Sequence, residues 1–182
     1  MSFTIHTFET KGKAMELQNV HVIEINWEGP FTMDEIKNFT TDIDFGLYMA
    51  YGPHNIYGNN VLLYVGKAEQ QTLGARILQH MEEDWYGTEQ IFIGRLGGDQ
   101  IPRMSDWDQS IDYAETKLIQ YCLPSWNASK FNSHSEKSFG EAIIINNGVR
   151  LTSIPTILAD WIYKSSSFHN KTWKPFSNLN TM

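Results

Sequence analysis

Six polar residues in the middle of this chain have the types and the order that suit hydrolysis of a phosphate diester. They are Tyr48, Tyr64, Arg76, His80, Glu115 and Asn127. An arginine fork grips phosphate oxygens, a carboxylate holds a hard cation, and a phenol or an imidazole moves a proton. Taken together, the six residues predict a site that binds a metal ion and a phosphate.

Glu115 is the strongest single anomaly, because it interrupts the apolar face of a predicted helix. The apolar residues on that face are Ile111, Leu118, Ile119 and Cys122. Burying a carboxylate is costly unless it is ion-paired or bound to a cation. Two interpretations stay open: an edge glutamate that reaches solvent or an ion pair, and a ligand for Mg²⁺, which takes few carboxylates and keeps several waters.

Arg76 and His80 are four residues apart in a predicted helix and therefore project from the same face. Ile77 and Met81 mark the buried side of that helix. The pair is either the polar rim of an amphipathic helix or an arginine that binds phosphate beside a supporting histidine. The spacing alone does not separate the two interpretations.

Tyr48 and Tyr64 lie in strand-like runs that we expect to pair, so both phenols could face one site. A phenol acts as a general base only if a nearby cation lowers its pKa from about 10. Lys67, Arg76 or a bound metal could do this. The alternative is ordinary cross-strand packing of two aromatic side chains.

Asn127 follows a helix that we expect Pro124 to stop. Its amide could hold a phosphate or orient a tyrosine. The alternative is a loop asparagine that bonds its own backbone.

The elements that must position these residues form one domain of 182 residues with three parts. Residues 1–44 are expected to hold a strand over His21–Trp27 and a short helix through Phe39, opened by a capping box of Thr32 and Glu35. In residues 45–132 the pattern predicts strand, strand, helix, strand and helix. These elements are Phe45–Ala50, Val61–Val65 after a long loop, Thr72–Trp85, Gln90–Leu96, and a helix capped by Ser105 or Asp106 that runs to Leu123.

Residues 133–182 are expected to hold a hairpin and a helix. The hairpin strands are Glu141–Ile145 and Val149–Ile154, which turn at Asn147-Gly148. Pro155 is then expected to open a helix through Lys164.

Composition indicates a globular protein, with 41% hydrophobic and 13% aromatic residues. The longest apolar runs are too short to cross a bilayer, and the N-terminus has no secretory pattern. The single cysteine, Cys122, excludes a disulfide within the chain and a cysteine-based zinc site. A reducing cytoplasm is the expected location.

The net charge of −7 is unevenly distributed along the chain. Residues 1–45 carry 3 basic and 8 acidic side chains, residues 46–125 carry 5 and 10, and residues 126–182 carry 6 and 3. A strongly acidic protein is not a generic nucleic-acid binder, but a positive C-terminal third could face phosphates. An uneven solvated surface explains the same distribution.

These motifs resemble those of the GIY-YIG nuclease superfamily. The resemblance covers residues 45–132 and is carried by Gly46-Leu47-Tyr48, Tyr64-Val65-Gly66, Arg76 with His80, Glu115 and Asn127. It implies an α+β fold, in which a small three-stranded antiparallel sheet is flanked by helices, with N- and C-terminal extensions. Leu47 and Val65 replace the isoleucines of the family pattern, and Tyr64 follows Tyr48 by 16 residues.

The resemblance also implies a role for each matching residue. Tyr48 would accept a proton or assist the group that does, and Tyr64 would lie beside the attacking water. Arg76 would bind the scissile phosphate with the support of His80. Glu115 would hold one Mg²⁺ or Mn²⁺, and Asn127 would complete the pocket.

The sequence therefore predicts a metal-dependent DNA endonuclease that leaves a 5′-phosphate and a 3′-hydroxyl. Lys67, the long loop between the two tyrosine motifs and the added arms are similar to the restriction-endonuclease branch. Cutting both strands of a duplex would call for a homodimer, and the basic C-terminal third with Asn147-Gly148 is the expected DNA contact. Two alternatives stay open: a non-catalytic binding module that prefers a protein partner, and a nuclease for RNA or single strands.

Overall fold

The computed structural model describes residues 20–82, 87–97, 101–128, 142–149 and 154–159. The elements in chain order are β1 His21–Phe31, α1 Met33–Ile36, β2 Gly46–His54, β3 Gly58–Ala68, α2 Leu73–Glu82, β4 Gln90–Leu96, α3 Ser105–Cys122, β5 Ala142–Gly148 and β6 Ile157–Ala159. None of the helices among these residues is long and apolar enough to cross a membrane.

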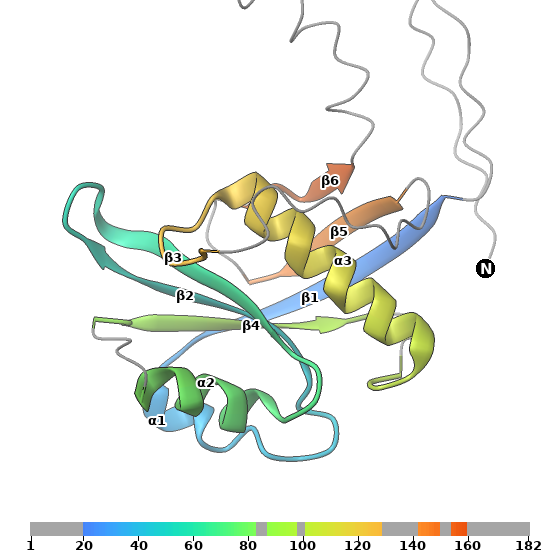
Figure 1. Cartoon of the computed structure of the whole chain (residues 1–182), viewed down its shortest axis with the longest axis horizontal. Helices are drawn as coiled ribbons and strands as arrows, with labels where there is room; N and C mark the ends of the chain where they lie inside the picture. The colour runs from blue at the N-terminus through green and yellow to red at the C-terminus, as the bar shows by residue number, and fades with distance from the viewer. Residues whose placement is uncertain (1–19, 83–86, 98–100, 129–141, 150–153, 160–182) are drawn as a thin grey trace, which may run out of the picture.

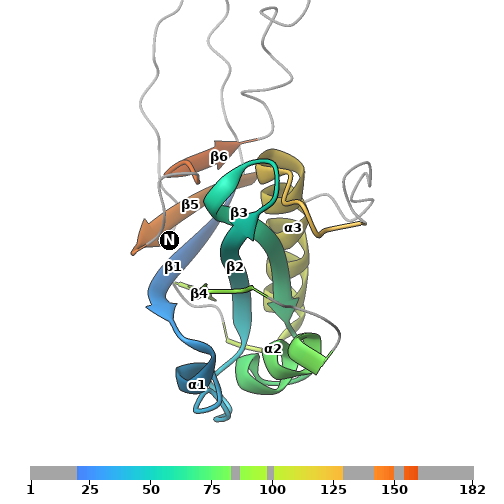
Figure 2. The ribbon, with the colours of Figure 1, turned by 90° about the vertical axis from the view of Figure 1, so that its left-hand side faces the viewer.

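The six strands form one curled, mixed sheet in the order β3-β2-β4-β1-β5-β6 (Figures 1 and 2). The neighbours are antiparallel except β1 and β5, which run parallel. Helices α1 and α2 lie against one face of this sheet, and α3 crosses the other (Figure 1).

The prediction of a small three-stranded antiparallel sheet is therefore wrong. The strands expected in residues 45–132 do lie side by side as β3, β2 and β4, but β4 also pairs with β1 from the N-terminal part. Strand β1 pairs in turn with β5 from the C-terminal part. Segments expected to be extensions thus complete the same sheet, because the exposed edge of β4 is a ready template for another strand.

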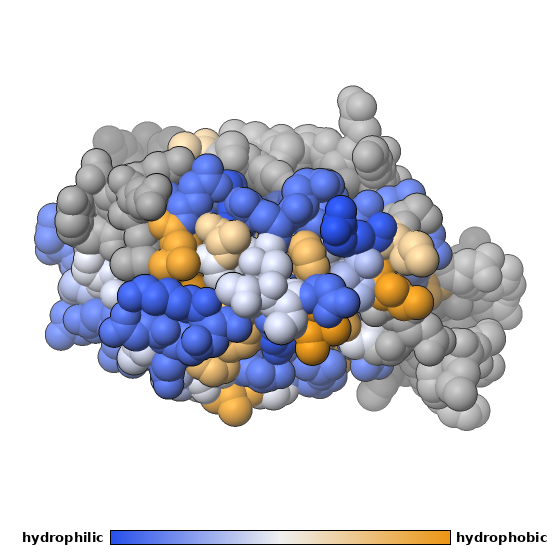
Figure 3. Space-filling view, turned by 90° about the horizontal axis from the view of Figure 1, so that it is seen from below, coloured by the Kyte–Doolittle hydropathy of each residue, from blue (hydrophilic) through white to orange (hydrophobic). Residues whose placement is uncertain are grey.

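Strand β2 separates two cores by the alternation of its side chains. Leu47, Met49 and Tyr51 belong to the larger core beneath α3. Tyr48 points the other way, into a smaller core with Leu73 and Ile77 near α2. Over α1 and α2 the outer surface is mostly hydrophilic, with separate hydrophobic patches (Figure 3), as expected for amphipathic helices.

Several local predictions are confirmed. The capping box of Thr32 and Glu35 is present at the start of α1, and β4 has the expected bounds. The helix before Pro124 ends as expected, with Leu123 in the left-handed conformation. Its N-cap, however, is Met104, which makes no side-chain cap, so the expected capping by Ser105 or Asp106 is wrong.

Two turn predictions are wrong. The residues expected to form a long loop between the tyrosine motifs instead extend β2 and β3, which are joined by a three-residue turn at 55–57. Asn147-Gly148 is not a hairpin turn, because both residues lie in β5 and pair with Asn26 and Trp27 of β1. Residues 150–153, where the second hairpin strand was expected, lie outside the described residues.

A helix was also expected from Pro155 through Lys164. Among the described residues of this segment, Ile157–Ala159 form strand β6 instead, and residues 160–164 lie outside the described residues. This strand is anchored by Asn146, which is fully buried in β5. The backbone N–H of Asn146 donates to the carbonyl of Thr156 over 2.7 Å. Its side chain accepts from Trp27 Nε1 at 2.9 Å and donates to the carbonyl of Pro155 at 3.0 Å. One amide thus connects β1, β5 and the start of β6.

We expect Asn146→Ala to lower the free energy of unfolding by about 1–3 kcal/mol, because the buried indole N–H of Trp27 loses its acceptor. Urea unfolding followed by circular dichroism measures this. The adjacent Asn147→Ala, at a half-buried position of the same strand, is the control and should change the unfolding free energy by less than about 0.5 kcal/mol. Equal effects of the two substitutions would contradict the observed pairing.

Candidate active site

The hairpin of β2 and β3 places Tyr48 and Tyr64 on the same face. Its register pairs Tyr48 with Gly66 and Ala50 with Tyr64, so the two tyrosines are diagonal neighbours across the strands. Their ring centroids are 6.0 Å apart with an interplanar angle of 22°. Tyr48 is fully buried and Tyr64 is half-buried. The phenols therefore share one site, as the sequence predicts.

Gly66 makes this arrangement possible. A Cβ atom at this position would lie 2.5 Å from Tyr48 Oη and 2.6 Å from Tyr64 Cε1, closer than real Cβ atoms approach other heavy atoms. The two rings rest on the bare backbone of β3. Only glycine therefore fits at position 66 while both rings stay where they are.

Helix α2 brings a histidine against both phenol rings. The ring of His80 lies 5.2 Å from that of Tyr64 and 6.2 Å from that of Tyr48. Arg76 lies one turn earlier, is half-buried, and its charge acts on the phenol of Tyr48. Its Nη1 also donates to Gln79 Oε1 at 3.1 Å. The i, i+4 spacing of the arginine and the histidine thus produces a shared face, as expected.

Glu115 approaches the same site from α3. Its residue is 7% exposed, and its charge acts on the phenol of Tyr48. Helix α3 packs against β3, which is the edge strand of the sheet. A side chain of α3 can therefore reach around this edge to the face of the sheet on which α2 lies. The sequence left open an edge position that reaches solvent, and the burial of this residue disagrees with that interpretation.

The pKa of Tyr48 is raised well above its ordinary value. Burial is the largest cause, since it disfavours the phenolate, and Tyr64 and Glu115 raise the pKa further. Arg76 acts in the opposite direction but does not compensate. The lowering by a nearby cation that a general-base phenol requires is thus present from Arg76 but is outweighed by burial. At neutral pH Tyr48 is a hydrogen-bond donor.

Lys67 lies on the opposite face of β3 from the tyrosines, paired with the core residue Leu47. Its ammonium forms ion pairs with Glu69 and, at 3.0 Å, with Asp112 of α3. Burial alone would lower its pKa, but these two carboxylates raise it. The structure therefore does not bring Lys67 to the phenols. It connects α3 to the strand that carries Tyr64.

Asn127 holds the backbone of β3 between the second tyrosine and the glycine. Its Oδ1 accepts from the N–H of Val65 at 2.9 Å, and its Nδ2 donates to the carbonyl of Val65 at 2.8 Å. The N–H of Trp126 donates to the carbonyl of Leu63 at 2.8 Å. The segment after α3 thus closes the free edge of β3. Of the three roles that the sequence left open, orientation of a tyrosine through its strand agrees with this geometry.

The described residues contain no group of three or more histidine, cysteine, aspartate or glutamate side chains that could hold a metal ion. A cation at this site would therefore take Glu115 as its protein carboxylate and complete its shell with water and substrate. A buried carboxylate whose charge acts on the phenol of Tyr48 offers hard oxygen donors. Such a set fits Mg²⁺ or Mn²⁺, which bind through one or two carboxylates plus substrate phosphates.

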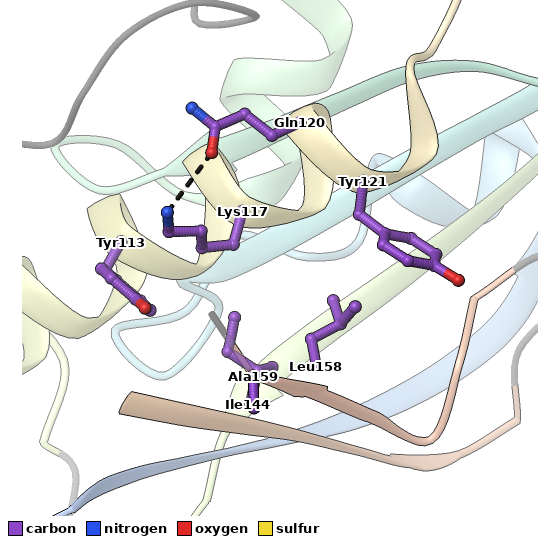
Figure 4. Close-up of a pocket in the computed structure, with 7 residues that line it drawn as sticks. All are labelled: Tyr113, Lys117, Gln120, Tyr121, Ile144, Leu158 and Ala159. Atoms are coloured by element: carbon purple, nitrogen blue, oxygen red, sulfur yellow. Dashed lines mark hydrogen bonds between the residues drawn. The ribbon is translucent and has the colours of Figure 1, made fainter. Parts of the chain in front are cut away.

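A separate cavity of about 200 Å³ lies on another side of α3 (Figure 4). It is lined by Tyr113, Lys117, Gln120 and Tyr121 of α3, and by Ile144, Leu158 and Ala159 of β5 and β6. Lys117 Nζ donates to Gln120 Oε1 at 3.3 Å. None of the seven residues singled out from the sequence lines this cavity.

Sequence reasoning missed the role of Asp112. The structure pairs it with Lys67. No local pattern could reveal this pairing, since the two residues are 45 positions apart.

No family model, no curated protein and no solved structure matches this chain.

We expect Asn127→Asp to lower the free energy of unfolding by about 1–3 kcal/mol at pH 7. The carboxylate can still accept from the N–H of Val65, but it has no donor for the carbonyl and places a charge against it. The measurement is urea unfolding. Asn55→Asp, in the exposed turn of the hairpin, is the matched control and should be nearly neutral. Unchanged stability of Asn127→Asp would contradict the bridging role.

Proposed function

We propose that this protein is a divalent-metal-dependent endonuclease that hydrolyses phosphodiester bonds of DNA. The observation that carries the proposal is the meeting of Tyr48, Tyr64 and His80, with ring centroids 5.2 to 6.2 Å apart. Arg76 and Glu115 act on the same phenol. These five side chains come from four different elements, and the resemblance to the GIY-YIG nucleases assigns each of them to one site.

Substrate binding falls to Arg76. Its guanidinium offers planar donors that match phosphate oxygens and stabilise charge as it develops on them. The hydrogen bond from Arg76 Nη1 to Gln79 Oε1 at 3.1 Å orients that guanidinium on the helix face that packs near the phenol. Tyr48, fully buried and held protonated, lies behind this guanidinium as part of the wall of the site.

Proton transfer falls to the pair of Tyr64 and His80. Tyr64 is half-buried, so its phenol can hold a water molecule, and the imidazole of His80 lies against its ring. Imidazole is the side chain that most often serves as general base. The water oxygen bonds to phosphorus as its proton passes to His80. The bond to the 3′ oxygen breaks and that oxygen takes a proton from solvent, which leaves a 5′-phosphate and a 3′-hydroxyl.

Glu115 would hold Mg²⁺ or Mn²⁺, which when bound supplies polarisation of the phosphate and stabilisation of the leaving oxygen. Near-complete burial makes an unpaired charge on this carboxylate costly, so a bound cation would be favoured there. The glutamate also raises the pKa of Tyr48 and so helps to keep that phenol a donor.

One such site cuts one strand, so cleavage of both strands of a duplex, as in restriction enzymes, calls for two copies of the chain. The proposal therefore includes a homodimer on duplex DNA. The charge of +3 over residues 126–182, from 6 basic and 3 acidic side chains, supports a DNA-facing surface in the C-terminal third.

We expect the purified protein to nick or cut plasmid DNA with Mg²⁺ or Mn²⁺, and to leave it intact with EDTA. Glu115→Gln should lower the rate by about 100-fold or more, because the buried carboxylate is lost at nearly unchanged volume. The exposed Glu89→Gln is the control for the same chemical change and should cut at the native rate.

The result of this assay also separates the alternatives. No cutting of methylated or unmethylated plasmid by the native protein would contradict the proposal and favour a binding module. Cutting restricted to single strands or RNA would leave the chemistry but change the substrate. Equal cutting by the native protein and Glu115→Gln would contradict the assignment of the metal ligand.

A further inference from the structure

The tip of the β2–β3 hairpin is an exposed apolar projection with no role in the site described above. Strand β2 enters its turn at His54, and β3 leaves it at Gly58. Between them Ile56 is 80% exposed and Tyr57 is 71% exposed. In Figure 1 the hairpin extends beyond the helices that cover the two faces of the sheet. Two large apolar side chains are thus presented together to solvent, a feature that indicates an interaction surface.

The tip is ordered by its own contacts. Nδ1 of His54 accepts hydrogen bonds from the N–H groups of Ile56 and Tyr57, at 3.2 and 3.3 Å. The rings of His54 and Tyr57 stack with centroids 4.7 Å apart and an interplanar angle of 22°. A surface that is already ordered loses little conformational freedom when it binds a partner. The exposed isoleucine is therefore held in place at the end of a fixed ribbon.

The hairpin differs from the rest of the chain in that it has no acidic side chains. The protein carries 21 acidic residues, yet residues 45–68 contain no aspartate or glutamate. The polar side chains near the tip are amides, Asn55, Asn59 and Asn60, all exposed. In an acidic protein this is a segment that can approach a phosphate backbone without carboxylates of its own.

We propose that this tip, defined as residues 53–60, enters the major groove of duplex DNA. A two-stranded β-ribbon has the width that the major groove admits, asparagine amides match the edge of adenine, and an aliphatic side chain fits the thymine methyl. The proposal rests on the proposed function, since the same two strands carry Tyr48 and Tyr64. It adds the element that reads the substrate.

The strands set the distance between the tip and the candidate active site. From Tyr48 to His54 the chain advances six residues, or roughly 20 Å at the rise of a strand. The tip is therefore roughly 20 Å from Tyr48 along the strand, outside the candidate active site.

The test compares two matched charge substitutions at exposed isoleucines. Ile56→Glu places a carboxylate at the tip, and Ile101→Glu places one in the segment between β4 and α3, where the residue is 60% exposed. Binding to a short duplex is measured by fluorescence anisotropy at low salt, with Ca²⁺ in place of Mg²⁺ to prevent cutting. We expect the Kd of Ile56→Glu to rise by about 10-fold or more and that of Ile101→Glu to change less than about 2-fold.

A second measurement keeps this proposal separate from the proposed function. Hydrolysis of thymidine 5′-(4-nitrophenyl phosphate) with Mn²⁺ requires the active site but no groove contact, so Ile56→Glu should hydrolyse it at the native rate. Equal duplex binding by the two variants would overturn the tip proposal alone, whereas no duplex binding by the native protein would overturn both proposals. A native protein that binds duplex through the tip but hydrolyses neither this diester nor DNA would overturn the proposed function alone.

The exposed tip could instead contact a second copy of the chain, and this alternative is tested separately. Light scattering of the native protein and of Ile56→Glu, both without DNA, measures the oligomeric state. Loss of a dimer in Ile56→Glu would assign the tip to contact between copies of the chain and would overturn the DNA assignment.

Discussion

The packing of two tyrosine rings on the backbone of Gly66 is the constraint on which the candidate site depends. Tyr48 Oη and the ring of Tyr64 occupy the space that any Cβ at position 66 would need. This contact fixes the distance between the phenols and leaves room for His80 and Arg76 on the same side. The chemistry proposed for the site follows from this packing, because burial raises the pKa of Tyr48 and so keeps the phenol a donor.

Strand β3 has to be rigid for this contact to hold, although it lies at the edge of the sheet. Two interactions supply the rigidity from outside the sheet. Asn127 satisfies both backbone groups of Val65, and Lys67 connects the strand to Asp112 of α3. Both residues were singled out from the sequence as members of the site. Their geometry instead makes them supports that hold the tyrosine-bearing strand.

The sequence predicted the parts of the fold that depend on neighbours in the chain. Helix spacing placed Arg76 and His80 on one face, the residue pattern gave the bounds of β4, and Pro124 gave the end of α3. The size of the sheet could not be predicted in this way. It depends on the pairing of β1 with β5, which are about 120 residues apart and meet through Trp27 and Asn146. The turn-forming pair Asn147-Gly148 was overridden by that pairing, and the direction of the Tyr48 pKa depended on a burial that no local pattern reveals.

The measurement that tests the central claim most directly is the activity of Gly66→Ala. The kcat/KM for thymidine 5′-(4-nitrophenyl phosphate) should fall by about 100-fold or more, because displacement of catalytic groups by about 1 Å is enough for such a loss. The rate is measured at a temperature where circular dichroism shows the variant to be folded. Gly97→Ala is the control, since its Cβ would meet the end of the Asn26 side chain at 2.8 Å, which can move aside. Native activity in folded Gly66→Ala would contradict the claim that the tyrosine packing forms the active site.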